Sequence, residues 1–458
     1  MITSLIRFSR RHLIHTLIVS TQNIKPSFPT PSHLKTYNLS VCDQSMPNAF
    51  SPLVTFYPRA SIYHSTYDQM LDLKNALSRT LTKYYPFAGR HAKIAPTFVD
   101  CNDHGAEFIE ATVDSTLSDF LKNSKHEDLD QFFPFGRTWS NSSGHDRLQS
   151  DIVIPLAVKV NHFECGGLAV AVSLSHKVAD AYSCVRFVSD WAKMTRACLR
   201  KETDEVRSIN DPKFISFQNT SIKFSGFSLE TSNDCVTRSF VFPNAKINEL
   251  KVKVKAMTAG SGQPIINPTR VEVLTWLLYK CSIEANIKNN FGSFKPTSIR
   301  VATNIRDKMI EQLPENAIGN FLTGMEVQTT TEMDLKPEFL IRELRNQKKK
   351  IQSIKNVEAA FAPLLNNTSS SDLDLEELQR KFENAYLCTS VCRYPAYAIN
   401  FGWGTPVKAT LPGNMRKNSF LLMDTPNEDG IEVLVCLGKQ DMDVIKMDPD
   451  ILSIANIY

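Results

Sequence analysis

Two spacings of hydrophobic residues recur along this chain of 458 residues, and they predict different elements. Between Leu73 and Tyr84 the apolar or semi-apolar positions recur every three or four residues, which is typical of one face of an amphipathic helix. Pro86 follows and is expected to end that helix. The segment GLAVAVSLS, from Gly167 to Ser175, is continuously small or apolar, so we expect a strand that is buried on both faces.

Helical spacing returns directly after this strand. In the segment DAYSCVRFVSDWAKMTRA the residues Ala181, Val185 and Val188 fall on one face. Asp180 stands where the N-cap residue of such a helix belongs. His176 is therefore expected in a short turn between the end of a buried strand and the start of a helix.

The second half of the chain interleaves strands and helices in the same way. Residues 196–230 lose apolar periodicity over a length that is unusual inside a compact domain, so we place a crossover there. The segment TRSFVFPNAKINELKVKVKAM predicts a strand and an amphipathic helix, TRVEVLTWLLYKC predicts a buried helix, and the polar tract 366–377 predicts a loop. We expect an α/β fold with mixed sheets, divided into a basic extension (1–16), a first domain (17–195), the crossover and a second domain (231–458).

Composition narrows the possible partners. Charged residues make up 22% of the chain and the formal charge is only +4, so we expect no nucleic-acid partner. No run of 18 apolar residues predicts a membrane span. The ten cysteines form no CxxC pair, which favours reduced thiols in a cytoplasmic setting over disulfides. His162 and Cys165 are too few for a zinc site, so no metal is expected.

The N-terminal segment is basic and contains no acidic residue before Asp43. Such a composition resembles an organellar transit peptide. The alternative is a short basic extension ahead of a first strand at about Leu17–Ser20, and we favour this alternative, with a cytoplasmic location.

The candidate chemistry lies in a pattern of one histidine and one aspartate four residues apart. This HxxxD pattern occurs three times, at His64–Asp68, His126–Asp130 and His176–Asp180. The first two copies lie in polar contexts typical of solvated surface, whereas the third follows a buried strand. A neutral imidazole in such a turn can act as a general base. Because the chain has no GxSxG motif, the base would have to activate a substrate hydroxyl, an amine or water.

Several stretches together resemble one family, the plant BAHD acyltransferases, which move an acyl group from a coenzyme A thioester to an alcohol or amine. The stretches include IKPSFPTPSHLKTYNLSVCDQ, LSRTLTKYYPFAGR, VDCNDHGAEF, FECGGLAVAVSLSHKVADA, NPTRVEV, NIRDKM, AIGNF, NFGWGTP and FLLMDTPNEDGIEVLV. Their order and spacing cover nearly all of residues 17–458. The resemblance implies two chloramphenicol-acetyltransferase-like domains joined by a long crossover loop, with the active-site channel between them.

The resemblance also assigns roles to particular residues. The family's HxxxD motif falls on His176 and Asp180, so His176 is expected to be the general base in the channel. Asp180 is expected to be structural, to point away from the channel and to pair with Arg306. From the residues alone, Asp180 remains open between capping the helix and orienting the imidazole.

The family's DFGWG motif falls on residues 400–404, where Asn400 replaces the aspartate. The resemblance implies that Asn400, Gly402, Trp403 and Gly404 are structural residues and that Trp403 and its neighbours shape the site. Because an asparagine carries no charge, the basic partner of the family's aspartate is expected to have changed or to be solvated. We name Arg300 as the candidate for that partner.

The resemblance implies acyl-CoA as co-substrate, with acetyl-CoA expected, and no permanently bound cofactor. Its phosphates need cations, for which the run Lys348, Lys349, Lys350 and Lys355 is available, although a solvated helix face is the favoured interpretation of that run. The local sequence of several segments is most similar to the branch that contains vinorine synthase, salutaridinol acetyltransferase, capsaicin synthase and the acylsugar acyltransferases. The YFGNC motif of the anthocyanin malonyltransferases is replaced by AIGNF at Ala317–Phe321, which argues against a malonyl donor.

We therefore expect a monomeric O-acyltransferase that transfers an acetyl or other short acyl group to a hydroxyl of a plant specialised metabolite, such as an alkaloid or a sugar ester. Two alternatives stay open. A hydrolase would use the same histidine to activate water on a thioester, and a catalytically silent binding homologue is compatible with Asn400.

Overall fold

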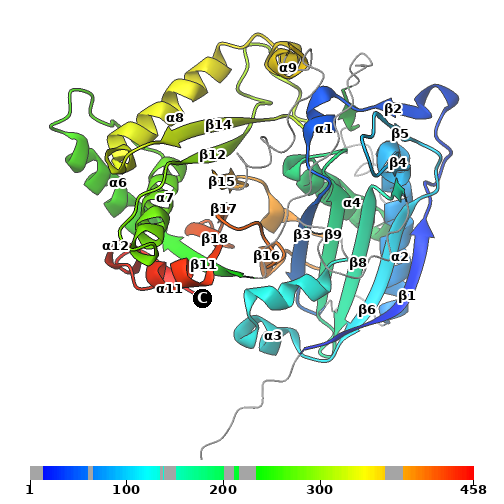
Figure 1. Ribbon diagram of the computed structural model, residues 1–458. Helices are drawn as coiled ribbons and strands as arrows, with labels where there is room; N and C mark the ends of the chain where they lie inside the picture. The colour runs from blue at the N-terminus through cyan, green and yellow to red at the C-terminus, as the bar shows by residue number, and fades with distance from the viewer. Residues whose placement is uncertain are drawn as a thin grey trace, which may run out of the picture.

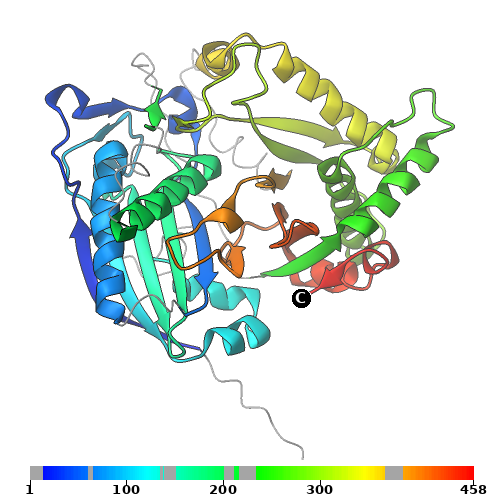
Figure 2. The same ribbon diagram turned by 180° about the vertical axis from the view of Figure 1, so that it is seen from behind.

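The computed structural model describes residues 14–59, 65–134, 138, 151–200, 211–215, 234–366 and 385–458 (Figure 1). Four sequence expectations fall partly or wholly outside these residues: the basic segment up to residue 13, His64, most of the crossover and most of the polar tract 366–377. Among the described residues the chain builds two large sheets, each flanked by helices (Figures 1 and 2).

The first sheet has six strands in the order β1-β6-β8-β9-β3-β16. The strands are β1 (Thr16–Ile24), β6 (Ala106–Val113), β8 (Leu156–Phe163), β9 (Leu168–Ser175), β3 (Phe50–Tyr57) and β16 (Lys408–Thr410). β6 and β8 run parallel and the other pairs run antiparallel, so the sheet is mixed. All eight residues of β9 are buried, which confirms the strand predicted over Gly167–Ser175.

Two long helices cover one face of this sheet, as Figure 2 shows. α2 (Thr66–Lys83) buries the predicted stripe that includes Leu73, Leu77 and Leu81, which confirms the helix expected before Pro86. α4 (Ala181–Arg200) packs against α2, where the indole Nε1 of Trp191 donates to the main-chain oxygen of Leu73 at 3.0 Å. The helices thus form a layer that shields one side of β9 from solvent.

The second sheet has seven strands in the order β14-β12-β15-β17-β18-β11-β19. The strands are β14 (Leu322–Thr329), β12 (Thr297–Asn304), β15 (Ala385–Ser390), β17 (Ser419–Asp424), β18 (Gly430–Gly438), β11 (Cys235–Pro243) and β19 (Asn456–Ile457). β15 runs parallel to both β12 and β17, and the other pairs are antiparallel. Both large sheets are therefore mixed, as expected for this α/β fold.

The helices of the second half are α6 (Asn244–Thr258), α7 (Arg270–Asn289), α8 (Pro337–Gln352), α9 (Val357–Asn366), α11 (Lys439–Ile445) and α12 (Pro449–Leu452). β11 followed by α6 confirms the predicted strand and helix, and the many buried residues of α7 confirm the predicted buried helix. The shorter elements near the first sheet are α1 (Val41–Ser45), α3 (Leu117–Asn123), β2 (Thr36–Asn38), β4 (His91–Ala92), β5 (Phe98–Asp100) and β7 (Ile152–Val153). Two more short strands, β10 (Lys213–Phe214) and β13 (Ala317–Ile318), pair with each other in parallel.

Two features depart from a simple division of the chain at residue 195. α4 continues to Arg200, because Ala197 extends its buried face, so residues 196–200 are helical rather than part of a loop. β16 comes from the second half of the sequence but pairs with β3 at the edge of the first sheet. The two halves are thus joined by more than one passage of the chain, and the predicted domain boundaries stay a prediction.

Candidate active site

His176 lies in the turn between β9 and α4, where the sequence placed it. Its main-chain N–H donates to the oxygen of Ala49 at 2.9 Å, and the N–H of Val178 donates to the oxygen of Ser175 at 2.9 Å. These bonds fix the backbone of the turn at the end of the buried strand. The side chain is half-buried, so the imidazole is partly withdrawn from water without being sealed off.

Asn320 determines which ring nitrogen of His176 is free to act as a base. Nδ1 of His176 lies 3.0 Å from Oδ1 of Asn320. The amide nitrogen of Asn320 donates to Oδ1 of Asp43 at 2.8 Å and to the main-chain oxygen of His176 at 2.7 Å. Because both amide N–H groups have acceptors, the amide oxygen must face the ring, and Nδ1 must carry the proton. Nε2 is then the nitrogen with a free lone pair.

Asp43 anchors this arrangement from α1, a short helix that begins with a capping box. Oδ2 of Asp43 accepts from the main-chain N–H of Ser40 at 2.8 Å and from its hydroxyl at 2.7 Å, while Asn320 N–H donates to Oδ1 at 3.1 Å. Burial raises the pKa of Asp43 to about 6, although its hydrogen-bond donors oppose that rise. The contacts form a continuous chain from Ser40 through Asp43 and Asn320 to His176.

Asp180 is completely buried and faces Arg306. Nη1 of Arg306 lies 2.7 Å from Oδ2 of Asp180, and Nη2 lies 3.1 Å from Oδ1, so two hydrogen bonds support the ion pair. Oδ1 also accepts from the main-chain N–H of Ser183 at 2.9 Å, which makes Asp180 the cap of α4. Burial favours a raised pKa, but Arg306 and the backbone donors hold the pKa of Asp180 below its ordinary value. These contacts occupy the carboxylate away from the imidazole, as the resemblance implies.

The residues around Arg306 join the two halves of the molecule beside His176. The guanidinium group lies between the rings of Tyr182 and Phe321, at 4.6 and 4.7 Å from their centroids. Phe321 follows Asn320 directly, and its main-chain N–H donates to Asp180 at 3.2 Å. The segment after β12 therefore reaches from the second sheet to α4 and supplies both Arg306 and Asn320.

The surroundings of His176 favour its neutral form. Burial is the main cause that lowers the pKa of His176, and the charge of Lys177 lowers it further. Asp180 and the hydrogen bond to Asn320 oppose this shift without reversing it. A neutral imidazole with Nε2 unprotonated is the state that a general base needs.

The loop at residues 400–404 is held together by the side chain of Asn400. Its Oδ1 accepts from the main-chain N–H of Gly402 at 2.8 Å and of Gly404 at 3.1 Å. Gly402 has a φ of +113°, and a Cβ there would lie 2.7 Å from Leu199 of α4. Asparagine therefore keeps the acceptor on which the shape of this loop depends.

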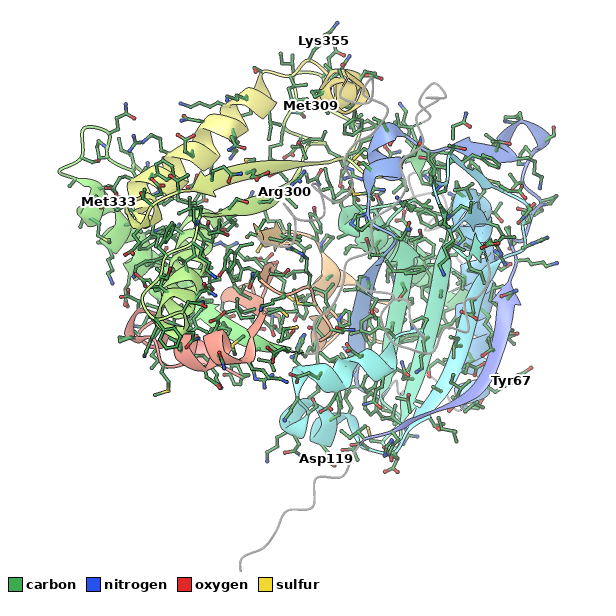
Figure 3. The ribbon with its side chains drawn as sticks, in the orientation of Figure 1. Tyr67, Asp119, Arg300, Met309, Met333 and Lys355 are labelled. Carbon is green, nitrogen blue, oxygen red and sulfur yellow. The ribbon has the colours of Figure 1, made fainter. Side chains whose placement is uncertain are left out.

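The arginine next to this loop is Arg196, not Arg300, which corrects the sequence expectation. Nη1 of Arg196, on α4, donates to the main-chain oxygen of Asn400. Arg300 lies on β12 in the second sheet, where Figure 3 labels it. Arg196 is half-buried, so part of its charge is solvated.

Trp403 lies near the end of β9 opposite the base, and its expected role in shaping the reacting site stays a prediction. Its ring stacks on Phe401 with centroids 5.3 Å apart, and it meets Tyr57 edge to face at 6.0 Å. Tyr57 pairs with Leu168, the first residue of β9, whereas His176 follows the last residue of that strand. Eight strand residues at about 3.3 Å each separate the two places by roughly 25 Å. The loop packs where apolar rings can be buried, at the opposite end of β9.

A small cavity lies at the seam between the two halves. Its walls are almost entirely apolar and come from β3, α4, the segment after β15, and β17. Tyr394 in this wall meets Tyr182 of α4 edge to face, with centroids 5.4 Å apart. The one carboxylate in the wall, Asp424, lies 3.3 Å from Arg270. Apolar side chains of both halves therefore meet at this seam, close to the start of α4.

The basic run considered for the phosphates of coenzyme A lies on the surface. Lys349 and Lys350 are exposed at the end of α8, and Lys355 lies 3.6 Å from Glu311 with both side chains largely exposed. Figure 3 places Lys355 at the outer edge of the molecule, which fits the favoured interpretation of a solvated helix face.

His126, the other described histidine of an HxxxD pattern, is not on the solvated surface as expected. It begins a 3₁₀ helix (His126–Phe132) that packs against β11, and its Nε2 is buried. Burial lowers the pKa of His126 to about 3. The polar sequence around it was misleading because the residues packed against this segment, among them Arg238 beside Glu127 and Gly413 beside the main chain of His126, lie far along the chain.

All ten cysteines are free thiols, six of them buried, whereas Cys165 is exposed. In the described part of the chain, a possible metal-binding group of Cys281, Glu284 and Asp448 lies near Lys280, whose ammonium group is 3.2 Å from Glu284. A cation therefore already balances this group. None of the described helices combines the length and the apolar character that crossing a membrane requires.

Comparisons with known proteins bear on the family and the fold of this chain. A family model described as "Transferase family" matches residues 14–452. The chain belongs to the BAHD acyltransferases. This BAHD chain superimposes on the crystal structure of vinorine synthase with a TM-score of 0.77 and 30% identity, over 96% of this chain and 99% of that one. The two-domain fold implied by the resemblance is therefore present.

Two relatives show how varied the family is at this level of similarity. An enzyme from Strychnos nux-vomica named 17,18-epoxy-17-hydroxycur-19-ene N-malonyltransferase is 34% identical over 96% of this chain and 90% of its own length. Deacetylvindoline O-acetyltransferase from Catharanthus roseus is 32% identical over 96% of this chain and 98% of its own length. Because both malonyl and acetyl groups occur in these names, overall similarity does not choose the donor.

Asn320 and Asp43 are the residues of the site that sequence reasoning missed. Both lie in stretches that carry the resemblance, AIGNF and SVCDQ, but no periodicity or spacing in the sequence connects them with His176. The contacts between them join positions 277 residues apart, so only the folded chain brings them together.

Proposed function

We propose that this BAHD enzyme transfers an acyl group from an acyl-coenzyme A thioester to a hydroxyl of a plant specialised metabolite, with His176 as the general base. The observation that carries the proposal is the chain of contacts from Asp43 through Asn320 to Nδ1 of His176. It leaves Nε2 unprotonated in a half-buried turn next to the seam between the two halves. A fixed tautomer of this kind is what general-base catalysis requires.

The proposed reaction proceeds in two proton-coupled steps. Nε2 of His176 accepts the proton of the acceptor hydroxyl while the oxygen attacks the thioester carbonyl, which gives a tetrahedral intermediate. The intermediate collapses by breaking the carbon–sulfur bond, and the departing thiolate of coenzyme A takes the proton from the imidazolium ion. Base catalysis of this type typically contributes about 10²–10⁴-fold to the rate.

Asp180 is assigned a structural role in this mechanism. Both of its oxygens are occupied by Arg306 and by main-chain donors, as described above. The same contacts cap α4 and link it to the segment that carries Asn320. Asp180 therefore fixes the frame in which the imidazole sits, whereas Asn320 orients the ring.

For the substrates, we propose an acetyl or other short acyl donor and an alkaloid alcohol or sugar ester as acceptor. The names of related enzymes support this choice, since they include an O-acetyltransferase and an acylsugar acyltransferase.

The proposal is tested by incubating the purified chain with acetyl-coenzyme A, or malonyl-coenzyme A, and a library of alkaloid alcohols and partly acylated sugars. Mass spectrometry should detect an ester product whose formation requires both substrates. Release of coenzyme A at the same rate without any alcohol would instead identify a thioester hydrolase.

The role of His176 is tested by comparing His176→Ala with His126→Ala. We expect the first variant to lose about 10³-fold in kcat/KM and the second to stay within about twofold of the parent protein. Thermal unfolding of both variants serves as the control for folding. Full activity of a folded His176→Ala variant would refute the mechanism.

A further inference from the structure

Lys177 is a buried cation directly beside the proposed base. Its side chain is 1% exposed, and its ammonium group donates to the main-chain oxygen of Gln44 at 2.8 Å. Among the described residues, no carboxylate lies within 4 Å of this ammonium group. A buried lysine that is bonded only to a neutral acceptor is costly, which calls for a reason at this position.

The bond from Lys177 reaches the same short helix that orients His176. Gln44 follows Asp43 in α1, and Asp43 holds the amide of Asn320 against the ring of His176. Two contacts therefore join the turn after β9 to α1. His176 reaches Asp43 through Asn320, and Lys177 bonds directly to Gln44. Loss of the bond from Lys177 to Gln44 is expected to disturb the contact between Asn320 and His176.

The charges around the imidazole come from three directions. Asp180, paired with Arg306, lies at the start of α4, and Asp43 lies on α1 behind Asn320. His91 of β4 also lies near Lys177, but burial lowers the pKa of His91 to about 4, so it is neutral at pH 7. Lys177 is therefore the cation near the ring that no carboxylate within 4 Å neutralises.

Lys177 keeps its charge over the pH range in which His176 titrates. Burial lowers the pKa of Lys177 to about 8, which still leaves it mostly protonated at pH 7. A nearby positive charge disfavours the imidazolium form of a histidine. The effect of Lys177 therefore has the same sign as that of burial, which also favours neutral His176.

We propose that Lys177 is a positioning residue that acts through His176: its buried ammonium group ties α1 to the active-site turn, and its charge keeps the imidazole in the neutral form that accepts a proton. This inference rests on the proposed function of His176 as the base. It adds a residue outside the reacting groups whose contact with α1 and whose charge both act on the base.

The first test measures the imidazole itself and needs no substrate. NMR titration of the histidine ring signals, with His176→Ala used to assign the signal, gives the pKa of His176 in the parent protein and in Lys177→Met. We expect the pKa to rise by about half a unit to one unit in the variant. An unchanged pKa in folded Lys177→Met would overturn the proposal.

Lys159→Met is the matched control. Lys159 is also 1% exposed, burial also lowers its pKa to about 8, and its ammonium group donates to the main-chain oxygen of Gln131. It lies on β8 opposite Ala171, away from the turn. Loss of this buried cation should leave the pKa of His176 unchanged, and an equal shift would show a general effect of charge removal that contradicts a specific role.

The second test uses the pH profile of kcat/KM for acyl transfer. The acidic limb should move to higher pH by the same amount in Lys177→Met, and Lys177→Arg, which keeps the charge, should restore it. If Lys177→Met does not fold, Lys177→Gln provides the same comparison. If Lys177→Met is active and its pH profile is not shifted, the role of Lys177 is refuted and the proposed function stands. If the parent protein shows no acyl transfer that depends on His176, the proposed function itself is refuted.

Discussion

The chain contains two described copies of the same HxxxD spacing, and they differ in what surrounds the histidine. At His176, Asn320 fixes the ring and the aspartate four residues on is paired with Arg306. At His126, Nε2 has no hydrogen-bond partner among the described residues, and Asp130 accepts only from the main-chain N–H groups of residues 413 and 414. The spacing is identical, but only one copy has a side chain that orients the imidazole.

The comparison shows that burial alone does not make a base. Burial lowers the pKa of both imidazoles. At His126 the nearby charges of Lys408 and Arg238 lower it further, to about 3, and in the described part of the chain Nε2 has no hydrogen-bond partner. A general base also needs a fixed tautomer with one unprotonated nitrogen, and of the two described copies it is His176 whose ring is held by a side chain, that of Asn320.

The largest expected difference between the two copies is in the free energy of unfolding when the aspartate of each is replaced by asparagine. Asp180→Asn leaves Arg306, which is 4% exposed, without its counter-ion, and should lower the free energy of unfolding by about 3–5 kcal/mol. Asp130→Asn keeps an oxygen that accepts the same main-chain bonds and should cost about 1 kcal/mol or less. Urea unfolding of both variants gives the two values. Equal losses would mean that the two motifs are equivalent in the folded protein.

The next effect concerns the orientation of the ring. Asn320→Ala removes the acceptor at Nδ1 of His176, so kcat should fall about tenfold while KM changes little, as expected for the loss of about one hydrogen bond in the transition state. Asn161→Ala is the control, because Asn161 is an equally buried amide whose nitrogen donates to the oxygen of Phe132. A similar fall in kcat for the control would assign the effect to general destabilisation.

The pH dependence of stability should distinguish His126. Its folded pKa of about 3 lies below that of an unfolded histidine, about 6.5, so between these values the unfolded state binds more protons. Its contribution to stability is therefore complete above pH 6.5 and is lost as the pH falls toward 3. His126→Gln should flatten the curve of unfolding free energy against pH in this window, and curves that stay parallel would contradict the assignment.

The smallest effect should come from the loop at the opposite end of β9. Asn400→Asp restores a charge beside Arg196 and should raise the melting temperature by about 1–2 °C, with little change in turnover. Differential scanning calorimetry and steady-state kinetics measure the two quantities. A large increase in rate would mean that this loop does influence proton transfer, despite its distance from His176.

Much of the local structure could be predicted from single segments. The stripe from Leu73 to Leu81 and the apolar run before His176 gave α2 and β9, because the burial of side chains at regular spacing dictates the element. Asp180 could be predicted as the cap of α4, because capping depends on neighbours only three residues away. The predicted helical segment ends at Ala197, whereas α4 continues to Arg200.

The sequence by itself determined the family, the mixed α/β fold and the turn that carries His176, because each of these depends on residues that are close together or on the order of motifs along the chain. Only the tertiary structure decided which nitrogen of His176 is free, which arginine lies beside Asn400 and which HxxxD copy is ordered by its neighbours. The contacts of His176 with Asn320 and of Arg196 with Asn400 join residues 144 and 204 positions apart. Hydrogen-bond direction and charge act over a few ångströms in space, and the sequence alone does not specify which distant residues come that close.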